Sequence, residues 1–251
     1  MRKILITGGS EGIGQAAARA LAAEGGVVTL VARNPEKLQA ALRSLPGSGH
    51  SSLAADLSTP EGVALVAKHI DENRYNVFFN NAGSGLYGRF TELPLDKQLI
   101  LMHLNMDAVT VLAHHYLALA RPGDALVNTG SALAFVSLPG SAVYAASRAY
   151  VANLSESLWW EFKGKGIYVL GFNPGVVNSG FHNASGGTDE NRAAGQAPEA
   201  VAQELLRALR QRRHPRVVSG VANRLTQLLM RVLPRKTIVN MMGRFGPLKP
   251  A

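Results

Sequence analysis

The residues best suited to do chemistry lie in the run SALAFVSLPGSAVYAASR, residues 131–148. Ser131 precedes Tyr144 by thirteen residues, and Arg148 follows Tyr144 by four. If this segment is helical, residues four apart share one face, so Arg148 lies beside Tyr144. A fixed positive charge stabilises a neighbouring phenolate, which lets a Tyr act as an acid or base near neutral pH. The spacing alone also fits a helix that merely carries a Tyr and an Arg.

A glycine-rich turn near the N-terminus indicates a nucleotide site. TGGSEGIG, residues 7–14, lies between the apolar run KILIT and the Ala-rich stretch QAAARALAAEG. Between a strand and a helix, backbone N–H groups and the helix N-terminus can hold a pyrophosphate, and Gly14 permits close helix–strand packing. The alternative is a tight turn that needs glycine only for its geometry. The strand–turn–helix context favours nucleotide binding.

Strand-like and helix-like segments alternate along the chain. Apolar runs predict strands at 3–7, 27–31, 51–55, 77–79, 124–129, 167–172 and 216–219, and the longest helical patterns are 94–119 and 143–162. This alternation predicts an α/β fold, a single Rossmann-type doubly wound parallel sheet flanked by helices, in one domain over residues 1–251. With 251 residues, 47% of them hydrophobic, the chain can form one large core.

Composition narrows the classes of protein. The chain has no Cys, so disulfides and thiolate metal sites are excluded. We find no apolar run long enough to cross a membrane, and the N-terminal run is too short for a signal peptide. We therefore expect a cytoplasmic protein.

The turn has the spacing T-G-x-x-x-G-x-G, and through it the chain resembles the short-chain dehydrogenase/reductase family from about residue 3 to about residue 180. Further motifs follow in the family's order: Asp56-Leu57, Asn80-Asn81-Ala82-Gly83, Asn105 in HLNMDA, Ser131 with Tyr144 and position 148, and Asn173-Pro174-Gly175. The resemblance implies four catalytic residues, Asn105, Ser131, Tyr144 and Arg148. It also implies a cofactor-binding set: Gly8, Ser10, Glu11, Gly12, Ile13, Gly14, Arg33, Asp56, Leu57, Asn81, Ala82, Gly83, Pro174, Gly175 and Val177. We expect no metal site, because His103 and Asp107 have the i, i+4 spacing of metal ligands but no third ligand is evident.

The family reaction is hydride exchange between a nicotinamide cofactor and a carbonyl or secondary alcohol. The resemblance implies that Tyr144 protonates the carbonyl oxygen during reduction and that Ser131 hydrogen-bonds that oxygen. It places Asn105 at a helix bend, beside an ordered water of a proton relay, and the cation at 148 on the nicotinamide ribose. It also implies a homodimer or homotetramer.

Position 148 departs from the family, which has Lys there. Arg keeps the charge, but its guanidinium is larger and planar and does not release a proton. Two hypotheses follow. The chain is an active reductase that uses Arg148, which the presence of Asn105, Ser131 and Tyr144 favours, or it is an NADP(H)-binding protein with little turnover that serves as a sensor or assembly partner.

The segment after the second strand favours NADP over NAD. Ala32-Arg33-Asn34 offers no carboxylate to a ribose 2′-hydroxyl, whereas Arg33 can pair with a 2′-phosphate. Glu11 argues the other way, because NADP-dependent relatives often carry a base at that position of the turn. Arg33 as a solvated surface charge is the alternative. We predict NADP as the cofactor, with NAD less favoured.

Residues 176–197 are polar and Gly-rich, and we expect them to form a substrate lid in which Phe181 and His182 can line the pocket. A disordered surface loop is the alternative for the ligand-free protein. The lid governs which carbonyl or alcohol is accepted, and the sequence does not identify that substrate.

The C-terminal residues carry most of the charge. Residues 205–251 hold 11 Lys/Arg and no acid, whereas residues 1–204 hold 15 Lys/Arg and 17 Asp/Glu. Residues 220–251 form a basic amphipathic extension in which Leu225, Leu228, Leu229 and Val232 share one helical face, and Ile238, Met242 and Phe245 form a second stripe. Packing against the domain or another subunit is the favoured reading. The alternative is a peripheral membrane contact that delivers a hydrophobic substrate. No nucleic-acid-binding motif is present.

Overall fold

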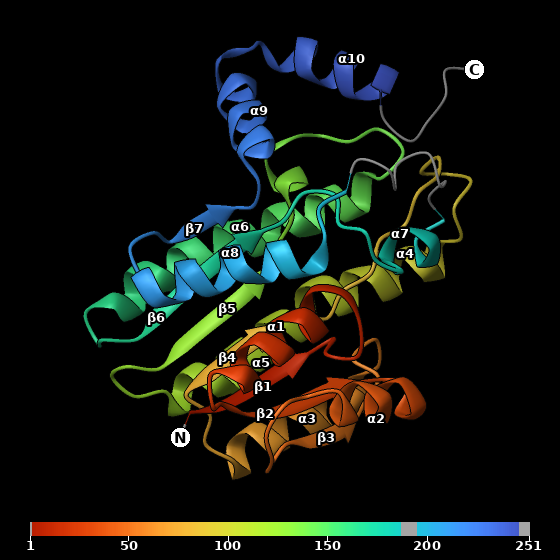
Figure 1. The fold of residues 1–251 in the computed structure, drawn as a ribbon. Helices are drawn as coiled ribbons and strands as arrows, with labels where there is room; N and C mark the ends of the chain where they lie inside the picture. Colours follow the sequence, from red (N-terminus) through yellow and green to blue (C-terminus); the bar gives the residue numbers. More distant parts are fainter. Residues whose placement is uncertain (1, 187–194, 246–251) are drawn as a thin grey trace.

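A computed structural model describes residues 2–186 and 195–245, which are arranged around one parallel sheet (Figure 1). The strands are β1 (Lys3–Thr7), β2 (Val27–Ala32), β3 (Ser51–Ala54), β4 (Val77–Asn80), β5 (Ala125–Thr129), β6 (Tyr168–Asn173) and β7 (Arg216–Val218). Their order is β3-β2-β1-β4-β5-β6-β7. The order reverses between β1 and β4, where open α/β sheets bind ligands. The predicted fold class is confirmed.

The sheet is buried on both faces because its strands are apolar at nearly every position. Ile4 and Ile6 of β1 pack in one core cluster with α1 (Gly12–Ala23), α2 (Pro35–Arg43) and α8 (Pro198–Gln211). Leu5 packs in the other cluster with α3 (Pro60–Glu72), α5 (Ala108–Leu119) and α6 (Ala142–Lys163). Alternate residues of a strand point to opposite faces, so helices cover both sides.

Local sequence signals fix where two of these helices begin. The side chain of Asn34 accepts the N–H of Lys37, and that of Thr59 accepts the N–H of Gly62. A proline follows each capping residue, at a position where the missing N–H costs no helical bond. These caps fix the starts of α2 at Pro35 and of α3 at Pro60.

The long helical pattern over 94–119 is interrupted around Asn105, where the family resemblance implied a helix bend and periodicity gave no sign of one. It consists of α4 (Leu95–Met102), a π-helical turn (His103–Asp107) and α5. Such turns insert one extra residue and often occur at functional sites. Asn105, which is fully buried, lies within this turn.

The predicted lid contains some regular structure. The described part holds a short helix, α7 (Phe181–Ala184), and an isolated bridge between Val177 and Gln196. That residues 176–197 form a substrate lid stays a prediction. Residues 187–194 and the side chain of His182 lie outside the described residues.

The basic extension forms α9 (Val221–Val232) and α10 (Arg235–Phe245), which stand beyond the sheet at the top of Figure 1. Ile238 of α10 is buried, but the predicted apolar face of α9 is exposed. The reading that this face packs against its own domain is wrong. The side chain of Phe245 lies outside the described residues. No helix in the described part is long and apolar enough to cross a bilayer.

Candidate active site

A cavity of about 710 Å³ opens at the carboxyl ends of β1, β4 and β5. Its volume is within the range of small-molecule sites. Every residue of the predicted catalytic and cofactor-binding sets lines it except Gly14 and Asn105. We call this end of the sheet, with the cavity, the carboxyl edge.

The glycine-rich turn has the geometry of a phosphate cradle. Gly8 and Gly12 have φ of 65° and 58°, a region that side chains disfavour. A Cβ on Gly14 would lie 2.2 Å from the carbonyl oxygen of Gly8, which explains why Gly14 supports the turn without lining the cavity. The side chain of Glu11 makes no capping hydrogen bond at the start of α1. The N–H groups of the first turn of α1 can therefore bind an anion, and the turn fits a dinucleotide pyrophosphate.

The Asn81-Ala82-Gly83 segment is tied to its neighbouring strands. The Thr7 hydroxyl accepts the N–H groups of Asn81 (2.9 Å) and Ala82 (3.1 Å). The Asn81 amide donates to the carbonyl of Thr7 at 3.1 Å and accepts the Thr129 hydroxyl at 3.2 Å. These bonds join the ends of β1, β4 and β5 into one rigid floor under the cavity.

The far end of the cavity is lined by cations. Arg33, predicted to bind a 2′-phosphate, lies there with Lys37, which sequence reasoning missed. Lys37 Nζ lies 3.0 Å from a carboxylate oxygen of Glu11, and both side chains are more than half exposed. Lys37 could have been found as the third residue of the helix that Asn34 caps. Glu11 is thus paired with Lys37.

Asp56 and Leu57 lie beside these cations. Burial raises the pKa of the Asp56 carboxyl, but the hydrogen bonds from Ser58 and the charge of Arg33 outweigh it and hold the pKa below its ordinary value. The Ser58 hydroxyl donates to Asp56 Oδ1 at 2.7 Å. Asp56 therefore remains ionised and fixed in place.

Tyr144 and Ser131 face the cavity from the other end. Tyr144 is in the first turn of α6, and the centre of its ring lies 5.9 Å from that of Phe181 in α7. Ser131 precedes a short 3₁₀ helix (Ala132–Phe135), and its hydroxyl accepts the N–H of Leu133. Within the described chain no hydrogen bond engages the Tyr144 hydroxyl or the Ser131 proton. Both groups can bond a ligand.

Arg148 lies one turn after Tyr144, as the spacing predicted, and is 3% exposed. Its Cζ is 5.0 Å from the centre of the Tyr144 ring. Nη1 donates to the carbonyl of Thr129 at 3.1 Å, and Nη2 contacts Asn105 Oδ1 at 3.5 Å. Nε has no partner among the described residues. The guanidinium is thus a fixed charge behind the tyrosine.

Asn105 acts from behind the cavity. Its Oδ1 accepts the N–H of Ser84 at 3.1 Å, while its Nδ2 donates to the carbonyl of Ser84 at 2.9 Å and to the Ser147 hydroxyl at 3.1 Å. The π-helical turn aims this amide at the 83–84 backbone and at Arg148. Asn105 positions the other site residues and does not itself line the cavity.

The cavity wall also contains residues that the sequence did not predict as site residues. Tyr87 lies there, and burial together with the neighbouring Tyr144 raises its pKa to about 12, although Arg148 opposes the shift. Leu104, Leu138 and Met242 add apolar surface. These come from separate loops and helices, so no local pattern links them.

Comparisons with known proteins agree with this geometry. A family model described as short chain dehydrogenase matches residues 2–190. Carbonyl reductase family member 4 from Danio rerio is 32% identical over 182 residues, which cover 71% of this chain and 76% of that protein.

Two solved structures illustrate the range of relatives. A short-chain dehydrogenase from Sphingobium yanoikuyae in complex with NADPH has a TM-score of 0.82 at 27% identity, covering 100% of this chain and 99% of that one. A short chain dehydrogenase/reductase from Burkholderia phymatum in complex with NAD has a TM-score of 0.82 at 20% identity, covering 100% and 97%. The second likeness shows the fold alone.

Proposed function

The chain belongs to the short-chain dehydrogenase family, and from this premise we propose that it transfers hydride between NADP(H) and a carbonyl or secondary alcohol, working in the reduction direction. One observation carries the proposal. The free hydroxyl of Tyr144 and the fixed guanidinium of Arg148 line the same cavity as the glycine-rich turn and the cations Arg33 and Lys37.

The cofactor part of the proposal is NADP. The N-terminus of α1 would hold the pyrophosphate, and Arg33 with Lys37 would hold the 2′-phosphate. Glu11 is already paired with Lys37, so it repels a phosphate less than an unpaired acid would. When bound, the nicotinamide supplies the hydride, and the chain supplies orientation and proton transfer.

Proton transfer falls to Tyr144. Its hydroxyl donates a proton to the carbonyl oxygen of the substrate, and the Ser131 hydroxyl hydrogen-bonds the same oxygen and orients it. The fixed charge of Arg148, 5.0 Å from the Tyr144 ring, stabilises the phenolate that remains. Asn105 and the Thr129 carbonyl keep that charge in place.

The substrate class that fits best is a hydrophobic aldehyde or ketone. Leu104, Leu138 and Met242 line the cavity, together with Tyr87 and Phe181. The hydroxyl groups of Ser131 and Tyr144 line the same cavity, an arrangement that can orient one reacting group on an apolar body.

We also propose a cytoplasmic homodimer or homotetramer, as the family resemblance implies. Apolar side chains on α4 support an interface there: Leu95, Leu99 and Ile100 are 66%, 54% and 48% exposed. Trp160 of α6 is 65% exposed, and α6 packs against α4. Light scattering of the purified protein measures the subunit number.

A second candidate is an NADP(H)-binding protein with little turnover. The observation that favours it is also at Arg148, whose Nη1 is turned to the Thr129 carbonyl and whose buried Nε has no partner in the described chain. A guanidinium held in this way is less free than an ammonium to follow a reacting group.

The test is NADPH oxidation against a panel of aldehydes and ketones, with binding followed by NADPH fluorescence. We expect wild-type turnover and a loss of about 10²–10⁴-fold in Tyr144→Phe with NADPH binding retained. Tyr150→Phe is the matched control, because Tyr150 lies on the same helix and its hydroxyl bonds Thr110 instead. Equal turnover in wild type and Tyr144→Phe would refute the catalytic role, and tight NADPH binding without oxidation would favour the second candidate.

A further inference from the structure

Helix α9 turns its apolar side away from the protein. The exposed side chains, which we call the α9 face, are 52–77% exposed: Val221, Leu225, Leu228, Leu229 and Val232. The residues turned inward are Gln227 and Met230, which line a groove against α6, and Asn223, which lines the active-site cavity. A helix on a water-soluble domain normally has the reverse arrangement. The α9 face therefore needs a partner.

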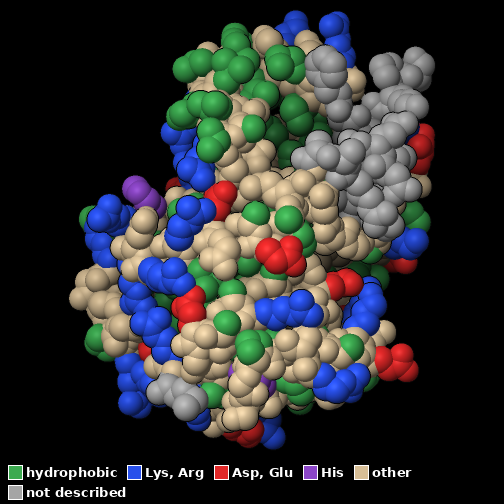
Figure 2. All heavy atoms as spheres, in the orientation of Figure 1, with side chains coloured by type: hydrophobic (Ala, Val, Ile, Leu, Met, Phe, Trp, Pro, Cys, Tyr) green, Lys and Arg blue, Asp and Glu red, His purple; other side chains and the backbone are tan. Residues whose placement is uncertain are grey.

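The charged side chains carried by α9 and α10 themselves are all basic. Arg231 of α9 and Arg235, Lys236 and Arg244 of α10 are exposed, and residues 205–251 contain no Asp or Glu. Arg231 and Arg235 also line the groove against α6. Arg224 pairs with Glu204 of α8 at 2.9 Å. Figure 2 shows hydrophobic side chains gathered at the top of the molecule, with Lys and Arg at their edge. An apolar centre bordered by cations is complementary to a lipid surface with negatively charged headgroups.

A second copy of the chain fits this surface less well. Pairing two α9 faces would bring the cations of both copies together, and neither helix offers an acid to pair with them. The exposed apolar residues of α4 and α6, proposed above as a subunit interface, belong to other elements. Charge complementarity therefore selects a lipid surface over self-association.

We propose that α9 and α10 dock the protein on anionic membranes, with the α9 face at the boundary between headgroups and acyl chains. Asn223 of α9 and Met242 of α10 also line the active-site cavity. Docking thus places the cavity wall at the lipid, from which a hydrophobic carbonyl compound can enter. This last step rests on the proposed function, whereas the docking does not.

Vesicle co-sedimentation of the full chain tests the docking without cofactor or substrate. We expect the protein to pellet with vesicles of phosphatidylcholine and phosphatidylserine and much less with phosphatidylcholine alone. Leu225→Gln with Leu229→Gln should lower partitioning about tenfold or more. The control is Leu65→Gln with Leu119→Gln, two leucines on α3 and α5 that are 45% and 48% exposed, which should change nothing. Because both leucines of the test pair are exposed, circular dichroism should show an unchanged fold.

A second pair of variants tests the charges. Arg231→Gln with Lys236→Gln should weaken binding to anionic vesicles by about fivefold for each cation removed, and added salt should weaken it further. Arg43→Gln with Lys97→Gln, which removes two exposed cations elsewhere, is the control. The remaining attraction to neutral vesicles should not change in either variant.

Three outcomes would overturn the proposal: pelleting that ignores phosphatidylserine, pelleting that survives Leu225→Gln with Leu229→Gln, or no pelleting at all. A dimer that dissociates in that double variant, without vesicle binding, would identify the α9 face as a subunit contact. Vesicle binding without NADPH oxidation would sustain the docking and contradict the reductase. Oxidation without vesicle binding would do the opposite.

Discussion

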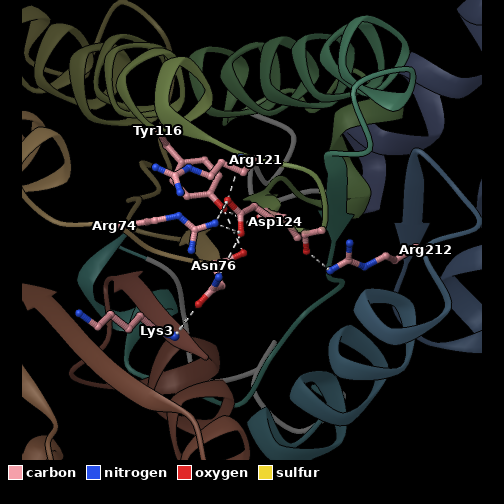
Figure 3. A network of polar contacts seen from close by, with 9 residues as sticks. Lys3, Arg74, Asn76, Tyr116, Arg121, Asp124 and Arg212 are labelled. Carbon is pink, nitrogen blue, oxygen red and sulfur yellow. Dashed lines mark hydrogen bonds and ion pairs between the residues drawn. The ribbon is translucent and has the colours of Figure 1, made fainter. Parts of the chain in front are cut away.

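The two ends of the sheet hold buried polar side chains in opposite ways. Asp124, at the amino ends of β1, β4 and β5, is 2% exposed (Figure 3). Its carboxylate accepts hydrogen bonds from the Arg74 guanidinium, the Asn76 amide and the backbone N–H of Arg121. The amide of Asn76 in turn accepts the N–H of Lys3. We call Lys3, Arg74, Asn76, Tyr116, Arg121 and Asp124 the amino-edge network. At the carboxyl edge, Arg148 is 3% exposed and lines the cavity.

The two ends differ in whether their buried polar side-chain atoms all have hydrogen-bond partners. In the described chain, the buried side-chain atoms without a hydrogen-bond partner include Arg148 Nε, and none belongs to the amino-edge network. A fully paired buried group rigidifies the fold, whereas an unpaired one beside a cavity marks a place where a ligand acts. We therefore assign stability to the amino edge and chemistry to the carboxyl edge.

The largest expected effect of a substitution at the amino edge is that of Asp124→Ala. It leaves Arg74 and Asn76 without their buried acceptor, and we expect the free energy of unfolding to fall by about 3 kcal/mol. Urea denaturation measures the loss, and kcat below the transition should not change. The control is Asp96→Ala, an exposed acid on α4. A kcat that falls in parallel with stability would contradict the separation of roles.

Gly83→Ala tests the carboxyl edge. A Cβ there would lie 2.4 Å from Arg148 Nη2, so the guanidinium must move. We expect turnover to fall about tenfold to a hundredfold, with a smaller effect on stability. Gly164→Ala, where the added Cβ meets nothing within 4 Å, should leave turnover unchanged. Wild-type turnover in Gly83→Ala would show that the position of Arg148 does not matter.

The affinities for NADPH and NADH test the roles of Arg33, Lys37 and Glu11 at the carboxyl edge. Arg33→Ala should raise the Kd of NADPH about tenfold, and Lys37→Ala about fivefold, because each removes a contact that we propose to the 2′-phosphate. Glu11→Gln should strengthen NADPH binding, since it frees Lys37 from its ion pair. Fluorescence titration measures these constants, and NADH binding should stay constant throughout. An equal change for NADH would assign these residues to the fold instead.

The smallest expected effect is that of removing the Tyr116 hydroxyl, at the amino edge. Burial and the nearby Asp124 raise the pKa of Tyr116, so its hydroxyl stays protonated as a donor. It lies 3.1 Å from the carbonyl oxygen of Asn76 and 3.0 Å from that of Ala125. Tyr116→Phe should lower the free energy of unfolding by about 1 kcal/mol without changing kcat. Thermal melts of Tyr116→Phe and Tyr150→Phe check this expectation. A larger loss of stability in Tyr116→Phe would show that the buried hydrogen bond matters more than the loss of a tyrosine hydroxyl as such.

Regular patterns made much of the fold predictable. The continuous apolar runs gave each strand to within a few residues, and the Tyr144–Arg148 spacing placed the two side chains together because helical geometry is regular. The π-helical turn at Asn105 was not predictable from periodicity, because one inserted residue shifts the pattern without ending it. Lys37 was missed because its ion pair with Glu11 joins residues 26 apart in the chain.

The orientation of α9 shows a further limit. Periodicity correctly grouped Leu225, Leu228 and Leu229 on one face. It could not say whether that face turns toward the domain, because the same pattern suits a core, a subunit contact and a membrane. Only the placement of Gln227 and Met230 against α6 decided the direction.

The central claim is that Arg148 acts as the fixed cation of an active reductase. The direct measurement is the single-turnover rate of NADPH oxidation in the wild type, Arg148→Lys and Arg148→Met, with the best carbonyl substrate of the panel. We predict a measurable wild-type rate, a rate within about tenfold of it for Arg148→Lys, and a loss of about a hundredfold or more for Arg148→Met, which removes the charge. An Arg148→Met rate equal to that of the wild type would contradict the claim.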